Sequence, residues 1–261
     1  SLAVLTALVC NPYGYGVFEF PKGQFLMIFS SIVLGVMTAH FCLNKEPKFR
    51  YNKYILIVFG LWLLSLILST IFSLAPQLSL WGSYERFQGL YSHYTYLIMF
   101  IAFLNILKDE ESQSIFLKVT IGIGVIAAIH SILQQFGIGT FGEGTMDVTI
   151  QRSFATMGNP NFLAQFLIFP LWGAAYFAVK ERGNKRLLYA IVAMIILVGI
   201  LLTKSRASIL GIIAATGLLT VFLLKIKKIY KYLLLFGIIA AFMLFVIFIA
   251  SNMQSLMARF Y

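Results

Sequence analysis

The segment GILLTKSRASILG (residues 199–211) decides the fold class, because it places two cations inside an apolar run from about residue 187 to residue 224. An ionised side chain in the hydrocarbon of a bilayer costs several kcal/mol. Lys204 and Arg206 are one residue apart, and the apolar stretch on each side is long enough for one membrane span. We therefore predict a turn at residues 203–207 between two spans, with both cations at the membrane boundary.

The composition extends this interpretation to the whole chain. Of its 261 residues, 60% are hydrophobic and 11% are charged, whereas soluble proteins carry about 25% charged residues. Apolar stretches of about 20 residues recur, and the alternation typical of a membrane β-barrel is absent. We predict an all-α, polytopic transmembrane helical bundle that forms a single domain over residues 1–261. About nine spans are expected, at residues 1–11 (partial), 22–43, 54–76, 92–107, 114–137, 160–179, 187–203, 207–224 and 232–250.

The loops between these spans separate into two sets by charge. Of the 20 lysines and arginines, 13 lie in the loops 44–53, 108–113, 180–186 and 225–231. Cytoplasmic loops are enriched in these cations, so this set is expected on the cytoplasmic side of the cytoplasmic (inner) membrane. The net charge of +11 thus reflects topology, and no nucleic-acid partner is expected. The loops predicted to lie outside are 12–21, 77–91, 138–159, 203–207 and 251–261.

Three arginines stand out in the predicted outside loops. Arg86, Arg152 and Arg206 each lie beside a predicted membrane entry point. Outside loops normally carry few cations, so three arginines facing one compartment suggest a bound anion. Simpler interpretations remain open: Arg206 extends from a turn to the interface, Arg86 pairs with Glu85 or with lipid headgroups, and Lys204 anchors the interface.

Three segments of the chain resemble a known family. They are WGSYERFQGLYSH (81–93), QRSFATMGNPNFLAQF (151–166) and LLTKSRASILG (201–211). In order and spacing they are similar to the O-antigen ligase and polymerase superfamily, and the resemblance covers nearly the whole chain. It implies a polytopic glycosyltransferase that uses a glycan linked to polyprenyl pyrophosphate. Protein O-oligosaccharyltransferases belong to the same group.

The resemblance also implies roles for individual residues. It implies an active site on the outer face, where Arg152 and Arg206 match the family's pyrophosphate-binding arginines as catalytic residues. A family histidine from a large external loop has no match here. We expect the chain to be a fragment cut at both ends, with this histidine in a missing C-terminal part. Substrate-binding candidates are Arg86, Lys204, Asn159, Asn161 and Tyr84, of which Tyr84 is either a membrane-belt residue or a platform for a sugar.

Arginines suit the implied chemistry. Breaking a sugar–phosphate bond leaves negative charge on the lipid pyrophosphate, and a guanidinium stays charged and binds phosphate oxygens in a fork. Donors aimed at developing charge stabilise the transition state. Two cysteines, three histidines and the scattered Glu85, Glu143 and Asp147 form no metal-ligand cluster. We therefore predict catalysis without a metal or a cofactor.

The GNPN sequence (158–161) marks the start of a span. Asn159 precedes a proline and is biased away from helix, and Pro160 suits the first helical turn. Asn161 is expected to satisfy free backbone groups or to contact sugar hydroxyls. A helix that starts here would also aim N–H groups at an anion.

The predicted function is transfer of a preassembled glycan from a polyprenyl-pyrophosphate donor to an acceptor on the outer face of the cytoplasmic membrane. The acceptor would be a glycan, a lipid or a protein, and membrane lipids are the other expected partners. A polysaccharide polymerase of the same superfamily is an equal alternative. A transporter or flippase for a lipid-linked or anionic substrate is another, although transporters often show repeated halves and no repeat is present.

Overall fold

The computed structural model describes residues 2–11, 17–43, 53–83, 88–138 and 152–223, and these residues are helical with no strand. The all-α prediction is confirmed. The chain divides into two compact units, Ser1–Ser205 and Arg206–Tyr261, and each is described by itself. The single-domain assignment stays a prediction.

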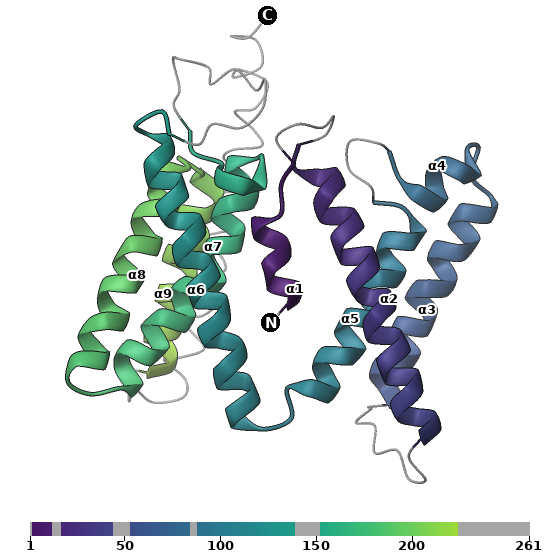
Figure 1. Cartoon of the computed structure of the whole chain (residues 1–261), viewed down its shortest axis with the longest axis horizontal. Helices are drawn as coiled ribbons and strands as arrows, with labels where there is room; N and C mark the ends of the chain where they lie inside the picture. Colours follow the sequence, from purple (N-terminus) through teal and green to yellow (C-terminus); the bar gives the residue numbers. More distant parts are fainter. Residues whose placement is uncertain (1, 12–16, 44–52, 84–87, 139–151, 224–261) are drawn as a thin grey trace, which may run out of the picture. The chain divides into compact units, whose positions relative to one another are not determined.

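The described part of the first unit holds ten helical elements, and that of the second unit holds one helix (Figure 1). The segment before α7 and the turn after α8 carry the site described below. The elements of the first unit are α1 (Leu2–Leu5), η1 (Thr6–Leu8), α2 (Glu19–Leu43), α3 (Lys53–Ile71), α4 (Pro76–Trp81), α5 (Leu90–Ile106), α6 (Glu110–Gln134), η2 (Ala155–Met157), α7 (Pro160–Lys180) and α8 (Asn184–Leu202). The second unit contains α9 (Arg206–Leu223).

Among the described residues, five helices are long and apolar enough to cross a membrane: α2, α3, α6, α7 and α8. Two shorter apolar helices, α5 and the Arg206–Gly217 part of α9, fall below that length. Each of these seven helices overlaps a predicted span. The predicted partial span at residues 1–11 contains only α1 and η1, and the span predicted at 232–250 lies outside the described residues. The count of nine spans is therefore not confirmed.

The end of α3 differs from the prediction. A span was expected to continue to residue 76, but α3 ends at Ile71 and a separate short helix, α4, begins at Pro76. A proline disfavours the helical conformation in the residue before it, and it fits the first turn of a new helix. Residues 77–81, expected as loop, therefore belong to α4.

Two helix starts follow directly from capping residues. The Asp109 carboxylate accepts a hydrogen bond from the Ser112 backbone N–H (2.7 Å) and so caps α6. Glu110 and Glu111 lie in the first turn of α6, where the helix dipole favours negative charge. The Ser112 backbone and hydroxyl both stabilise the ionised carboxyl, so they lower the pKa of Asp109. The expected start of α7 at Pro160 is confirmed, and Asn159 is its N-cap.

Helices α6, α7 and α8 pack against one another and form a three-helix core (Figure 1). Small residues at the contacts allow this close approach. A Cβ added to Gly199 of α8 would lie 2.8 Å from the Ala128 Cβ of α6, and one added to Gly124 of α6 would lie 2.6 Å from Pro170 of α7. In a membrane, lipid is as apolar as the side chains, so close packing of small residues contributes much of the helix association.

The outward faces of the long helices are apolar and exposed. Helix α3 has no buried residue in its most apolar stretch, and Leu61 and Val58 are more than half exposed. Exposed apolar surface of this extent is unfavourable in water but matches the hydrocarbon of a bilayer. The composition and these faces together indicate a membrane protein.

Candidate functional site

Two segments predicted to lie outside meet at one end of the α6–α7–α8 core. The Ser153 backbone N–H donates to the Leu202 carbonyl (3.2 Å), which joins the segment before α7 to the end of α8. Helix α6 ends beside them, at Gln134. We call this the Arg152 end of the core. The opposite end, where α6 begins and α7 ends, is the Lys180 end.

Arg152 is held in place at this end by two hydrogen bonds. Its Nε donates to the Thr203 carbonyl (2.8 Å), and one terminal nitrogen donates to the Asn161 Oδ1 (3.0 Å). The guanidinium is therefore fixed between the turn after α8 and the first turn of α7. An arginine carries five N–H donors, and these two bonds use two of them. Within the described residues no hydrogen bond is assigned to the other three.

A buried polar network supports the backbone beside Arg152. The Gln134 side-chain oxygen accepts from the backbone N–H groups of Phe154 (3.0 Å) and Ala155 (2.8 Å). The Ser153 hydroxyl donates to the Ser131 carbonyl (2.8 Å) and accepts from the Gln135 side chain (2.6 Å). Gln134, Ser153 and Ser131 are each at most 1% exposed. The end of α6 thus fixes the segment that carries Arg152.

The same segment is tied to α2 from its other side. The Lys22 ammonium donates to the carbonyls of Thr156 and Phe18, and the Thr156 hydroxyl donates to the Ala7 carbonyl (2.7 Å). Gly158 has φ +71°, and a Cβ there would lie 2.5 Å from the Phe18 ring. Only glycine satisfies both demands, which explains the glycine of GNPN.

Asn159 and Asn161 act together at the start of α7. The Asn159 Oδ1 accepts from the Asn161 backbone N–H (2.8 Å), as expected of an N-cap. The Asn161 side chain instead contacts Arg152. The prediction that Asn161 satisfies backbone groups or contacts sugar did not foresee this role in orienting an arginine.

The cations of the opening segment lie in and beside a three-residue turn. Helix α8 ends at Leu202 and α9 begins at Arg206, so the turn comprises residues 203–205 rather than 203–207. Lys204 is exposed and has φ +50°. Arg206 is also exposed, and it is the first residue of the second unit.

The sequence-predicted site is therefore assembled in part. Arg152 and Asn161 are in direct contact, and Asn159 bonds the residue that Arg152 contacts. Tyr84 and Arg86 lie outside the described residues. Sequence reasoning missed the supporting residues Gln134, Ser153 and Thr203. A signal was available for the first of these, because two consecutive glutamines at the end of an apolar span are costly unless their amides are bonded.

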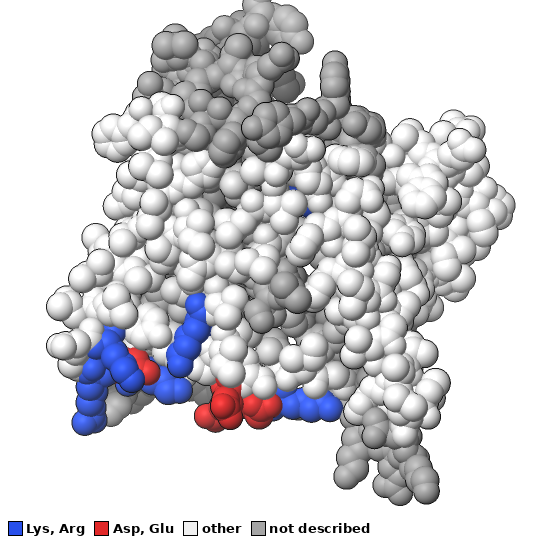
Figure 2. All heavy atoms as spheres, in the orientation of Figure 1, with Lys and Arg blue, Asp and Glu red and all other residues white. Residues whose placement is uncertain are grey.

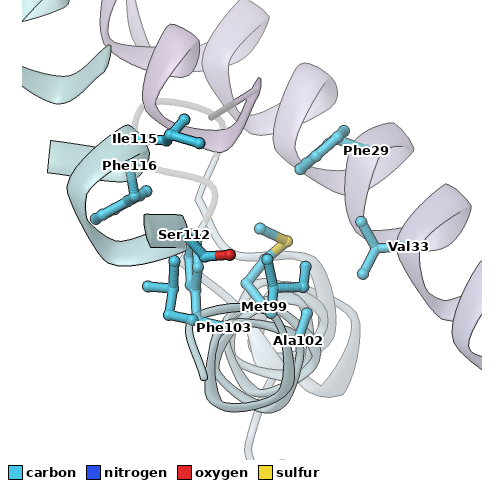
Figure 3. A pocket seen from close by; sticks show the side chains of 10 residues that line it. Phe29, Val33, Met99, Ala102, Phe103, Ser112, Ile115 and Phe116 are labelled. Carbon is cyan, nitrogen blue, oxygen red and sulfur yellow. The ribbon is translucent and has the colours of Figure 1, made fainter. Parts of the chain in front are cut away.

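Two other possible sites were considered. In the described part of the chain, no three His, Cys, Asp or Glu side chains are grouped so that they could hold a metal ion. A cavity of about 180 Å³ lies between α2, α5 and α6 (Figure 3). Its lining is apolar apart from Ser112, whose hydroxyl donates to Asp109, so it offers little for catalysis.

Comparison with known proteins adds no relative. No protein-family model matches the chain, and neither the curated proteins nor the solved structures give a match. The resemblance to the O-antigen ligase and polymerase superfamily therefore rests on the three sequence segments alone. What the structure contributes independently is the fixed guanidinium at the Arg152 end.

Proposed function

We propose that the protein is a membrane glycosyltransferase of the O-antigen ligase-like group. It would transfer a preassembled glycan from a polyprenyl-pyrophosphate donor to a glycan, lipid or protein acceptor. In this proposal the chain is a nine-span protein of the cytoplasmic membrane, and its active site faces outside. The observation that carries the proposal is the Arg152 guanidinium, which is bonded to the Thr203 carbonyl and the Asn161 side chain.

The first argument is the chemistry of that guanidinium. Both hydrogen bonds orient the group without neutralising it, because a carbonyl and an amide oxygen carry no net charge. A fixed, fully charged fork is suited to two phosphate oxygens. Since it is oriented before the substrate arrives, it stabilises charge that develops on a pyrophosphate leaving group without further reorganisation.

The second argument is the start of α7. The helix dipole favours an anion at this end, although Pro160 has no N–H group and the Asn161 N–H is already bonded to Asn159. Pro160 and Asn161 form this first turn, and Asn161 also contacts Arg152. An anion at Arg152 would therefore lie beside a second source of positive potential.

The third argument is the position of the site along the membrane normal. Helix α7 has 21 residues and so is about 30 Å long, close to the thickness of the hydrocarbon core. Arg152 lies at one end of this helix, where a lipid-linked pyrophosphate has its charged group at the boundary and its chain in hydrocarbon. Arg206, Lys204, Arg86 and Tyr84 remain candidates from the sequence.

The test is donor turnover by the purified protein in nanodiscs, with a radiolabelled glycan on polyprenyl pyrophosphate, candidate acceptors and EDTA. We expect wild-type transfer to survive EDTA and Arg152→Ala to lower kcat/KM at least about tenfold, equal to about 1.4 kcal/mol. Arg182→Ala, in the exposed loop at the Lys180 end, is the matched control and should keep full activity.

Other outcomes separate the alternatives. Growth of the glycan on itself, without another acceptor, would identify a polymerase. Passage of an intact donor across a liposome bilayer, with no transfer, would favour a flippase and contradict the proposal. Full transfer by both Arg152→Ala and Arg206→Ala would leave an enzyme but remove both arginines from its site.

A further inference from the structure

A second polar site lies at the Lys180 end of the core, away from Arg152. A pocket of about 360 Å³ is formed there between the start of α6 and the end of α7. Glu110, Gln113 and Ser114 line it from α6, and Tyr176, Phe177 and Lys180 line it from α7. Figure 2 shows charged side chains of both signs gathered along the edge where α6 begins and α7 ends, below a largely uncharged face.

Two ammonium groups lie over aromatic rings of this pocket, and one of them, that of Lys180, also belongs to a residue that lines it. The Lys180 Nζ lies 5.4 Å from the centroid of the Tyr176 ring, and the Lys118 Nζ lies 5.5 Å from that of the Phe177 ring. Both rings line the pocket. An ammonium held over a ring keeps its charge. Lys180 hydrogen-bonds the Tyr176 side chain and is attracted to Glu110, and an ammonium has three N–H donors, so donors remain for a further ligand. The pair therefore suits a phosphate group.

A carboxylate borders the same pocket. Glu110 and Lys118 are eight residues apart on α6, which separates them by about 12 Å along the helix axis. A purely anionic ligand would be attracted by Lys118 and Lys180 but repelled by Glu110. A ligand with a phosphate and a neighbouring ammonium would satisfy all three groups. The Ser114 hydroxyl and the Gln113 amide add neutral hydrogen-bonding groups.

The surroundings of the pocket match a lipid rather than a free solute. Phe177 is 2% exposed and closes the inner side of the pocket. On the same turn of α7, Val179 is 81% exposed and so would face hydrocarbon. Since α6 and α7 are both long enough to cross the membrane, their ends lie at the level of the lipid headgroups.

We propose that this pocket binds the phosphoethanolamine headgroup of a phospholipid. The phosphate lies between Lys118 and Lys180, and the lipid ammonium donates to the Glu110 carboxylate. Phosphatidylcholine lacks an N–H on its ammonium, and phosphatidylglycerol lacks the cation. The pocket therefore distinguishes three headgroups by charge and by hydrogen bonding. The proposal does not depend on glycan transfer or on Arg152.

The experiment measures lipid binding to the purified protein by native mass spectrometry, with phosphatidylethanolamine, phosphatidylcholine or phosphatidylglycerol added to delipidated protein in detergent. We expect phosphatidylethanolamine to bind at least about tenfold tighter than either other lipid, or about 1.4 kcal/mol. Glu110→Gln should remove its advantage over phosphatidylglycerol. The double variant Lys118→Gln, Lys180→Gln should weaken the binding of both phosphatidylethanolamine and phosphatidylglycerol.

Matched controls use charges at the same end that neither line the pocket nor lie over one of its aromatic rings. Glu111→Gln and Lys185→Gln change neighbouring exposed residues and should keep the wild-type preference. All five substituted positions are exposed, so each variant is expected to fold, with an unchanged thermal midpoint before lipid is added. Equal binding of the three lipids, a phosphatidylglycerol preference that Glu110→Gln leaves unchanged, or equal loss in the controls would each overturn the proposal.

Discussion

The two ends of the α6–α7–α8 core use polar residues in opposite ways. At the Arg152 end, Gln134 and Ser153 are buried and bond backbone groups of neighbouring segments. At the Lys180 end, Glu110 and Lys180 are exposed around an open pocket. In the described residues, no buried side-chain nitrogen or oxygen lacks a hydrogen-bond partner. Buried polar groups thus fix the backbone at the Arg152 end, while the charged groups that line the pocket at the Lys180 end are exposed.

The largest expected effect is on the free energy of unfolding, and it compares substitutions of two glutamines, one at each end of the core. Gln134→Leu removes the acceptor for the Phe154 and Ala155 N–H groups and leaves both unsatisfied. We expect the free energy of unfolding to fall by about 2–5 kcal/mol, since each unpaired buried donor costs about 1–3 kcal/mol. Gln113→Leu at the exposed Lys180 end should change it by less than about 0.5 kcal/mol. Thermal unfolding in detergent measures both, and similar losses would contradict the contrast between the ends.

The next effect compares two glycines in the packed helices. In Gly199→Ala the new methyl group would lie 2.8 Å from the Ala128 Cβ and 3.0 Å from its backbone, so α6 and α8 must separate. A destabilisation of about 1–3 kcal/mol is expected. In Gly173→Ala the nearest atom is the end of the Leu117 side chain at 3.2 Å, which can rotate away. The same unfolding assay should show a clearly smaller loss, and a reversed order would mean that α6 and α8 are less tightly packed.

A third pair of variants compares the unfolding cost of replacing a serine at each end of the core. Ser153→Ala removes one hydrogen bond to the Ser131 carbonyl and one from the Gln135 side chain. The expected cost is about 1–2 kcal/mol, because both bonds are at least partly buried. Ser114→Ala, in the pocket at the Lys180 end, should be nearly neutral for unfolding. A cost at Ser114 equal to that at Ser153 would show that the pocket is closed in solution.

The smallest effect concerns the charge that caps α6. Hydrogen bonds from Ser112 lower the pKa of Asp109 in the folded state. A depressed carboxyl pKa stabilises the fold above the unfolded value of about 3.9, and that contribution is lost as pH falls through the folded pKa. Asp109→Asn keeps a capping oxygen without the charge. Its thermal midpoint should be slightly below that of the wild type near neutral pH and should converge with it in acid. A difference independent of pH would exclude the charge as the cause.

The sequence determined the helical class, the approximate helix positions and the start of α7. Apolar runs of span length, Pro160 and the capping asparagine each act within one segment, so their effect is visible without a partner segment. Arg152 was also singled out by the sequence, because an arginine in a predicted outside loop runs against the usual distribution of cations, and its role stays a prediction. Pro76 indicated that a new helix begins there, but the continuous apolar character of residues 54–76 led to the prediction of a single span.

Only the tertiary structure decided what surrounds that arginine. Gln134, Thr203 and Asn161 are separated by 27 to 69 residues from one another, yet their bonds converge on the segment that begins at Arg152. No local pattern specifies which carbonyl a guanidinium will meet, because that depends on how the helices pack. The pocket at the Lys180 end arises in the same way, from α6 and α7 lying side by side. Local chemistry fixes the helices, and the packing of small residues fixes which polar groups meet at their ends.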